Sequence, residues 1–206
     1  MDSDDKYIEM TPQILAILTV QRIASYIGAL NREPGIWWFA IQDFDLALYS
    51  QLIAFLSGTT QLGAVKIGHQ TKMLDYLNDN AQNRSYPTDK NGNALKCEIA
   101  PFSELLVRST DPKFGFINNA QSHLILSDDQ RRDILKLHEF RNDLAHVQPV
   151  SWYVEKSGLP RMTEACTFAI EHLFKHCTAR IHLSQQQIDT NEKNLAVIAK
   201  ALGHAN

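Results

Sequence analysis

The chain has 206 residues, of which 44% are hydrophobic and 21% charged, and its formal net charge is −3. This composition is ordinary for a soluble globular protein, and the length suits one sizeable domain. The weak negative charge excludes a global basic field that would collect nucleic acid, so contact with RNA or DNA requires a local basic cluster. We expect a single helical domain over residues 1–206, with residues 1–10 as an N-terminal tail.

Thr11 and Pro12 predict the start of the first helix, because a threonine N-cap followed by proline at the first helical position is a common helix start. This helix is expected to run to about Leu30. A second helix, from about Ile36 to Ser57, is apolar nearly all round. Such a helix is typical of the centre of a bundle, and we expect Trp37–Trp38 to lie in the core rather than to stack on bases.

A third helix is expected from Leu62 to Asp79, although two glycines weaken its first half. Residues 80–100 are predicted to form a long loop, because this region is rich in Asn, Asp, Gly and Ser. Loops of this length are usually functional or disordered. Arg84 and Lys90, with a nearby tyrosine, offer a local basic and aromatic site for RNA. We treat both as candidate substrate-binding residues, beside the commoner outcome of a solvated loop.

The second half of the chain is also predicted to be helical. A short helix is expected at Pro101–Arg108 and a long one at Asp128–Val147. Another long helix is expected over Pro160–Ile188, because proline often opens a helix. A last helix is expected within residues 189–203, where Asp189–Glu192 resembles a capping box. The pattern predicts an all-α fold, an antiparallel bundle of four to five long helices with additional short helices.

The sequence gives little support for metal or cofactor chemistry. Cys97, Cys166 and Cys177 are scattered with no Cys-x-x-Cys pair, which argues against a disulfide scaffold and a thiolate metal cage. His172 and His176 have metal-ligand spacing on one helix face, but no third ligand can be named. We therefore expect no metal and no cofactor. The acidic N-terminus is unlike a signal peptide and no apolar run approaches ~18 residues, so we expect a cytoplasmic protein with no membrane segment.

The first long helix of the second half ends in the sequence Arg141-Asn142-Asp143-Leu144-Ala145-His146. At about 100° per residue, His138, Asn142 and His146 share one stripe of this helix. Arg141 precedes His146 by five residues, so on a regular helix the two side chains point roughly 140° apart. The partial negative charge of a helix C-terminus favours imidazolium, which makes His146 suited to proton transfer near neutral pH.

This motif resembles the signature of the HEPN superfamily: an arginine, a neighbouring polar residue that is often asparagine, and a histidine near the end of a late helix in an all-α domain. The resemblance covers residues 141–146 in motif and about 11–188 in architecture. It implies a metal-independent endoribonuclease, as in many HEPN toxins and phage-defence proteins, in which the RNA 2′-OH attacks the phosphate. In such an enzyme His146 acts as general acid or base. Arg141 holds phosphate oxygens, and Asn142 orients His146 or donates to phosphate.

The resemblance also implies partners. HEPN nucleases typically dimerise so that two motifs face each other, and the angular separation of Arg141 and His146 fits a homodimer with a composite site. RNA is the expected substrate, with His138 as a further substrate-binding candidate, and an antitoxin protein is a candidate partner. Some HEPN toxins carry a tyrosine two residues after the histidine, which a partner nucleotidyltransferase modifies. This chain has Gln148 there, which departs from the pattern that such an antitoxin requires.

A second interpretation is a catalytically inactive HEPN-like helical module that binds a partner protein or nucleotide. Local charge bears on the choice, because a nuclease needs a positive groove around His146. From Asp128 to Arg161 the chain has six basic and six acidic residues, which favours the binding module. The sequence does not say which of these charges surround the motif. Whether the chain is an enzyme stays open at this stage.

Overall fold

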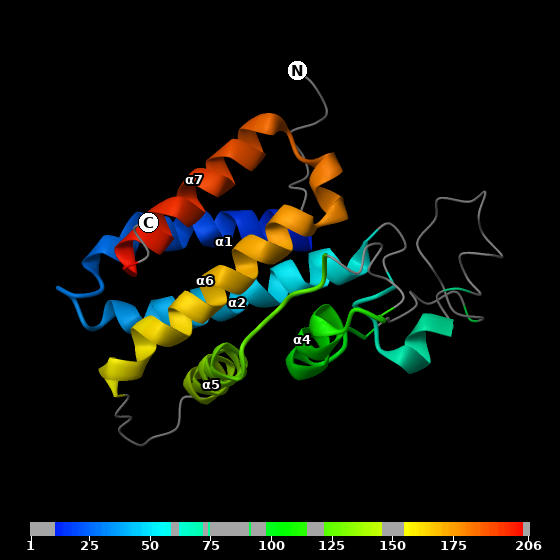
Figure 1. The fold of residues 1–206 in the computed structure, drawn as a ribbon, viewed down its shortest axis with the longest axis horizontal. Coiled ribbons are helices and arrows are strands. Elements are labelled where there is room, and N and C mark those ends of the chain that lie inside the picture. Colours follow the sequence, from blue (N-terminus) through cyan, green and yellow to red (C-terminus); the bar gives the residue numbers. More distant parts are fainter. Residues whose placement is uncertain are drawn as a thin grey trace.

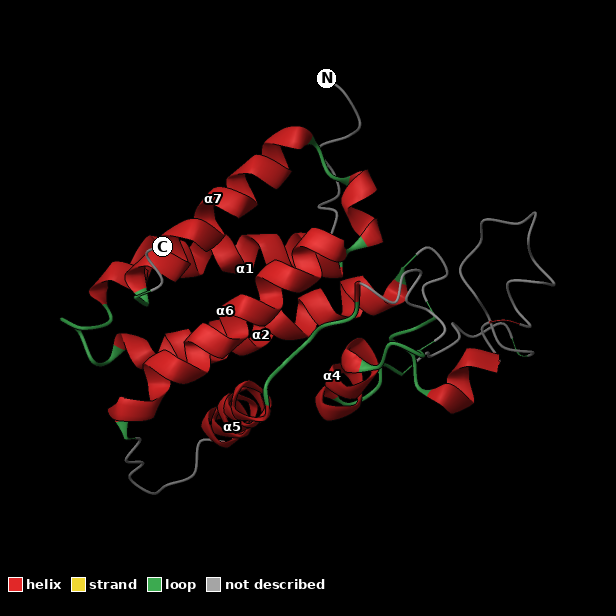
Figure 2. Ribbon diagram, in the orientation of Figure 1, coloured by secondary structure: helices red, strands yellow, loops and turns green. Residues whose placement is uncertain are grey.

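The computed structural model describes residues 11–58, 62–71, 74, 91, 98–114, 122–145 and 155–203. Its main helices are α1 (Pro12–Tyr26), α2 (Ile36–Ser57), α4 (Phe102–Thr110), α5 (Asp128–Ala145), α6 (Leu159–His176) and α7 (Gln185–Ala201) (Figure 1). Short 3-10 turns lie at Ile27–Ala29, Lys156–Gly158 and Thr178–His182. The described part of the chain has no β-strand, only an isolated antiparallel bridge between Val65 and Ile99 (Figure 2). The fold is all-α, as the sequence predicts.

Helix α2 is the centre of the bundle. It packs against α1, α4, α5 and α6, and side chains along its whole length, including Phe44, Leu48 and Leu52, are fully buried. This explains its nearly continuous apolar sequence, because a helix with neighbours on most sides has little face left for polar residues. By length and composition α2 could also cross a membrane, but 72% of its most apolar window is buried inside the bundle, as in a core helix.

The long helices pack in two directions. In Figure 1, α1 and α7 run opposite to α2 and α6, whereas α4 and α5 are seen nearly end-on and so cross the others steeply. Helix α5 packs on both α2 and α6, and α4 packs on α2. The long helices therefore form an antiparallel group of four, with α5 lying across it. This crossing brings the motif at the end of α5 against the middle of α2.

Several predicted boundaries are confirmed. Thr11 caps α1 by accepting a hydrogen bond from the backbone N–H of Ile14 at 3.2 Å, with proline at the first position. Gly58 follows α2 with a positive φ of 50°, as expected for a glycine at a helix end. The short helix predicted from Pro101 is α4, which begins one residue later.

The predicted division of the C-terminal region was wrong. One helix was expected over Pro160–Ile188, but α6 ends at His176 and α7 already begins at Gln185. Ser184 caps α7 through a capping box with Gln187, in place of the box predicted at Asp189–Glu192. A serine three residues before a glutamine is as good a start signal as the acidic pair, and no glycine or proline marks the end of α6.

The expectation that a helix begins at Leu62 was also wrong. Residues 62–66 are non-helical, and helix is present from residue 67. The buried guanidinium of Arg108 in α4 explains the difference, because it donates to the backbone oxygens of Gly63 at 2.7 Å and Val65 at 2.8 Å. These carbonyls are thus held by a side chain from a distant helix, and Val65 O also accepts from the Gln70 side chain at 3.2 Å. The N-terminal tail and most of the predicted 80–100 loop lie outside the described residues.

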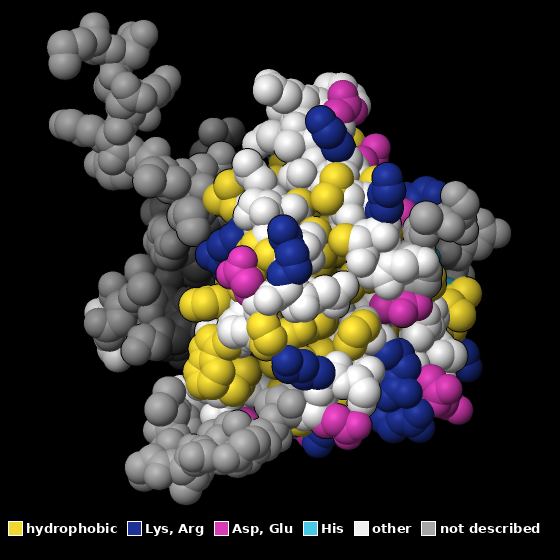
Figure 3. Space-filling model, turned by 90° about the vertical axis from the view of Figure 1, so that its left-hand side faces the viewer, with side chains coloured by type: hydrophobic (Ala, Val, Ile, Leu, Met, Phe, Trp, Pro, Cys, Tyr) yellow, Lys and Arg dark blue, Asp and Glu magenta, His cyan; other side chains and the backbone are white. Residues whose placement is uncertain are grey.

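The first turn of α2 reaches the surface. Trp37 is buried as expected, but the prediction was wrong for Trp38, which is 40% exposed, and Phe39 beside it is 62% exposed. Successive helical residues point about 100° apart, so only part of an aromatic run can face the bundle. Figure 3 views the molecule from this end and shows hydrophobic side chains gathered among separate lysine, arginine and acidic groups.

Candidate functional site

The motif stands on α5, whose start and buried face are defined by clear contacts. The backbone N–H of Ser127 donates to the Gln130 side chain at 3.0 Å, and the N–H of Gln130 donates to the Ser127 hydroxyl at 3.2 Å. This reciprocal cap fixes where α5 begins. Ile134, Leu137 and Leu144 are buried. With its start and buried side set, the helix presents Arg141 and Asn142 together near its C-terminal end.

Four side chains from α2 and α5 form a closed ring of polar contacts, which we call the Asp45 ring (Asp45, His138, Arg141 and Asn142). Nδ1 of His138 lies 2.7 Å from Oδ1 of Asp45. Nε2 of His138 lies 3.1 Å from Nδ2 of Asn142. Arg141 Nη1 donates to Asn142 Oδ1 at 3.1 Å, and Arg141 Nε lies 3.5 Å from Asp45 Oδ2.

The chemistry of these groups sets the direction of each hydrogen bond. A carboxylate only accepts, so His138 donates to Asp45 from Nδ1. The Nε2 atom of a neutral imidazole then accepts from the amide NH₂ of Asn142, and the amide oxygen accepts from Arg141. Each hydrogen bond of the ring therefore joins a donor to an acceptor, with one histidine tautomer and one amide orientation.

Two aromatic side chains border the Asp45 ring. Phe102, the first residue of α4, stacks on His138 with ring centroids 4.1 Å apart and ring planes 7° from parallel. Tyr49 of α2 lies 6.1 Å from Phe102, in a tilted arrangement. Burial raises the pKa of the Tyr49 phenol, the negative charge of Asp45 raises it further, and the positive charge of Arg141 opposes both. Three helices thus contribute to the site.

The Asp45 ring is buried at Asp45 and exposed to solvent at Arg141. The side chain of Asp45 is only 5% exposed, whereas those of His138 and Arg141 are 25% and 42% exposed. Phe102 is buried. The Arg141 guanidinium is therefore held along one edge by the protein and remains accessible to an anion, which is the arrangement that a phosphate-binding arginine needs.

The structure brings together three of the residues that the sequence singled out. His138 and Asn142 share a helix face, as their spacing predicts, and Arg141 contacts Asn142. The assigned roles of these residues stay predictions. His146, Arg84 and Lys90 lie outside the described residues.

Asp45 and Phe102 were missed by the sequence analysis. Asp45 stands in a helix whose other buried residues are mostly apolar, and a buried carboxylate is rare unless it has a partner. That contrast was the available signal. Phe102 carried none, because a phenylalanine at the start of an amphipathic helix is ordinary core.

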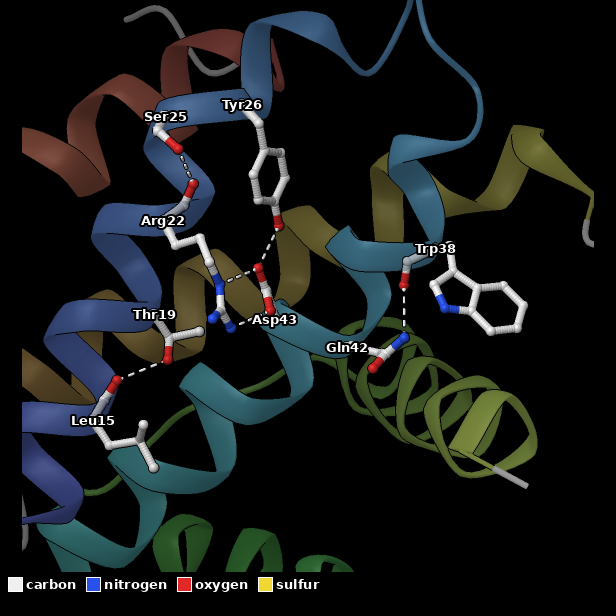
Figure 4. A network of polar contacts seen from close by, with 8 residues as sticks. All are labelled: Leu15, Thr19, Arg22, Ser25, Tyr26, Trp38, Gln42 and Asp43. Atoms are coloured by element: carbon white, nitrogen blue, oxygen red, sulfur yellow. Dashed lines mark hydrogen bonds and ion pairs between the residues drawn. The ribbon is translucent and has the colours of Figure 1, made fainter. Parts of the chain in front are cut away.

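Helix α2 carries a second buried carboxylate two residues earlier, which binds a different helix. Asp43 accepts from Arg22 Nε at 2.8 Å and from the Tyr26 hydroxyl at 3.1 Å, both from α1 (Figure 4). Burial raises the pKa of Tyr26 far above its usual range, and Asp43 adds to this shift. Asp43 thus joins α1 to α2 away from the motif, since residues two apart on a helix face nearly opposite sides.

No metal centre is found among the described residues, where no three His, Cys, Asp or Glu side chains gather in a way that could hold an ion. His172 and His176 do adjoin each other, with ring centroids 4.6 Å apart. Nε2 of His172 lies 3.1 Å from the backbone oxygen of Ser122. Burial and the neighbouring His172 lower the pKa of His176.

Comparison with family models, with curated proteins and with solved structures finds no match to this chain.

Proposed function

We propose that this chain is a metal-independent endoribonuclease of HEPN type, acting as a toxin or phage-defence effector. The observation that supports this proposal best is the Asp45 ring, in which a buried carboxylate and an imidazole contact the arginine and the amide of the motif. If the Arg-Asn-x-x-Ala-His pattern occurred in this sequence by chance, there would be no reason for its arginine and amide to contact a buried carboxylate and an imidazole. A preorganised, solvent-accessible arginine is what phosphate chemistry requires.

The chemistry needs only proton transfer and charge stabilisation. The RNA 2′-oxygen attacks the adjacent phosphorus and the bond to the 5′-oxygen breaks, leaving a 2′,3′-cyclic phosphate and a 5′-OH. His146 accepts the proton of the 2′-OH or donates one to the leaving 5′-oxygen, a contribution of about 10²–10⁴ in rate. Arg141 binds the non-bridging oxygens, where negative charge accumulates in the transition state.

A homodimer with a composite site is part of the proposal. One motif supplies one histidine, whereas the reaction has two proton transfers, one at each oxygen. A second copy of the chain facing the first would supply the second imidazole and a second arginine. Light scattering after size exclusion tests this directly, and full ribonuclease activity in a strictly monomeric sample would contradict the composite site.

The proposed activity is tested with purified protein, total RNA and a labelled oligoribonucleotide in EDTA. Wild type should leave 2′,3′-cyclic ends, and His146→Ala and Arg141→Ala should each lose this cleavage. Arg132→Ala is a matched control for lost charge, since this exposed arginine on the same helix pairs with Asp129 near the other end. Absence of cleavage by folded, dimeric wild type above the level of the variants would refute the proposal.

One observation favours a second candidate, the inactive module that binds a partner protein or nucleotide. Two exposed cations of α5 are engaged by acids of the same helix, Arg132 by Asp129 and Lys136 by Glu139. This leaves a weak positive field for RNA. The module is tested by thermal unfolding with a panel of nucleotides. A nucleotide that raises the Tm of wild type but not of Arg141→Ala would support it, and no shift with any nucleotide would contradict nucleotide binding.

A further inference from the structure

The two buried carboxylates of α2 differ in what they serve. Asp43 is matched by Arg22 and Tyr26, which belong to α1 and not to the motif helix. Among the residues that the structure describes, the short polar contacts of the Asp45 side chain go to the motif helix, to His138 and Arg141. Placing a carboxylate inside an apolar core is costly, so each needs strong partners. The partners of Asp43 join α1 to α2, whereas the partners of Asp45 are side chains of the candidate site.

Because Asp45 can only accept hydrogen bonds, it sets the donor and acceptor roles of the other side chains in the Asp45 ring, as far as Arg141. Because Asp45 cannot donate, the Nδ1 atom of His138 must carry the hydrogen, and Nε2 must accept from the NH₂ of Asn142. With the other tautomer, Nε2–H would meet that NH₂ group. Reversing the amide would relieve this conflict but would turn the NH₂ group of Asn142 toward the guanidinium of Arg141, where two donors would face each other. One buried charge thus selects the orientation of three side chains.

We propose that Asp45 is a positioning residue that orients Arg141 toward the phosphate group of RNA. It acts through His138 and Asn142 on one side and through its own contact with Arg141 Nε on the other. Phe102 assists by stacking on the imidazole, which removes freedom of rotation from His138. This inference rests on the proposed ribonuclease function, and it adds a residue from a helix 93 positions away from His138 in sequence.

The test compares Asp45→Asn with Asp43→Asn. Both remove one buried carboxylate from the same helix and keep the shape of the side chain, so general damage to α2 should be similar. Cleavage of the labelled oligoribonucleotide is measured together with binding of a fully 2′-O-methylated oligoribonucleotide, which cannot be cleaved. The ¹⁵N spectrum of the protein is recorded for the His138 ring and for Arg141 Nε–H.

A misplaced catalytic group can cost about 100-fold in rate, so kcat/KM of Asp45→Asn should fall by tenfold to about 100-fold, and binding of the methylated RNA should weaken. Asp43→Asn should stay within about twofold of wild type in both. In wild type and Asp43→Asn, His138 should be the Nδ1–H tautomer and Arg141 Nε–H should give a separate resonance. Asp45→Asn should lose the Arg141 signal from its position and shift the tautomer.

Equal activity and binding in Asp45→Asn and Asp43→Asn would overturn the positioning role, and so would an Nε2–H tautomer of His138 in wild type. Failure of the proposed function looks different. If wild type cleaves no RNA, the ribonuclease proposal is refuted, and binding of the methylated RNA then tests the positioning role of Asp45 by itself. Weaker binding by Asp45→Asn than by Asp43→Asn would support that role. Equal binding by the two variants, or no binding by any form of the protein, would overturn it.

Discussion

Replacing His138 by leucine tests the energetics of the Asp45 ring without any assay of function. The substitution removes the donor that lies 2.7 Å from Asp45 Oδ1, in a carboxylate only 5% exposed. Arg141 cannot replace it fully, because its Nε is 3.5 Å from the other oxygen, longer than a good hydrogen bond. The variant therefore retains a buried charge with a weak partner.

Two losses add up in this variant. A buried charged acceptor deprived of its donor costs about 3 kcal/mol, and the lost stacking on Phe102 costs about 1 kcal/mol. The expected total is about 4 kcal/mol, which for a chain of this length lowers Tm by roughly 8–16 °C. Thermal unfolding followed by circular dichroism at 222 nm, at one protein concentration, measures it.

The control is the double variant Asp45→Leu/His138→Leu, because leucine has the branching of aspartate without its charge. Removing the stranded carboxylate should make the double variant about 2 kcal/mol more stable than His138→Leu alone. A His138→Leu variant as stable as wild type would refute the reasoning. The reasoning would also be refuted if the stability losses of His138→Leu and Asp45→Leu added up to the loss of the double variant within about 0.5 kcal/mol, because residues in contact do not behave additively.

Three further predictions concern the framework around the site. Arg108→Met removes the guanidinium donor from the carbonyls of Gly63 and Val65, of which Val65 keeps the Gln70 side chain as a donor at 3.2 Å, and should cost about 2 kcal/mol in urea unfolding; a loss below about 1 kcal/mol would contradict the clamp on residues 62–66. Tyr26 has a raised pKa in the fold, so its stabilising contribution is complete below its unfolded pKa of about 10 and is lost as the pH rises beyond it. Tyr26→Phe should therefore lose less stability than wild type between pH 9 and about 11, and parallel pH profiles would show that the pKa of the phenol is raised neither by burial nor by Asp43. Ser184→Ala removes the cap of α7 and should cost about 1 kcal/mol; unchanged stability would mean that α7 begins elsewhere.

Local signals in the sequence account for most of the helices. Thr11 with Pro12 marks the start of α1, and the apolar run to Ser57 identifies the central helix, because capping and helical periodicity depend on neighbours within a few residues. The failures arose where a distant group decides. Residues 62–66 avoid helix because Arg108 binds their carbonyls from another element. The end of α6 is marked by no glycine or proline, but only by the weaker signal of Lys175 and His176 in its last turn.

The sequence by itself determined the all-α class, the central position of α2, and the placing of His138 and Asn142 on one face of α5, because each follows from helical geometry over short spans. Only the tertiary structure decided that Asp45 meets His138 and Arg141 and that Phe102 stacks on the imidazole. Those contacts join α2 to α4 and α5, which both cross it steeply (Figure 1). A crossing angle is set by how whole helix surfaces pack, so it is not written in the residues of any one helix.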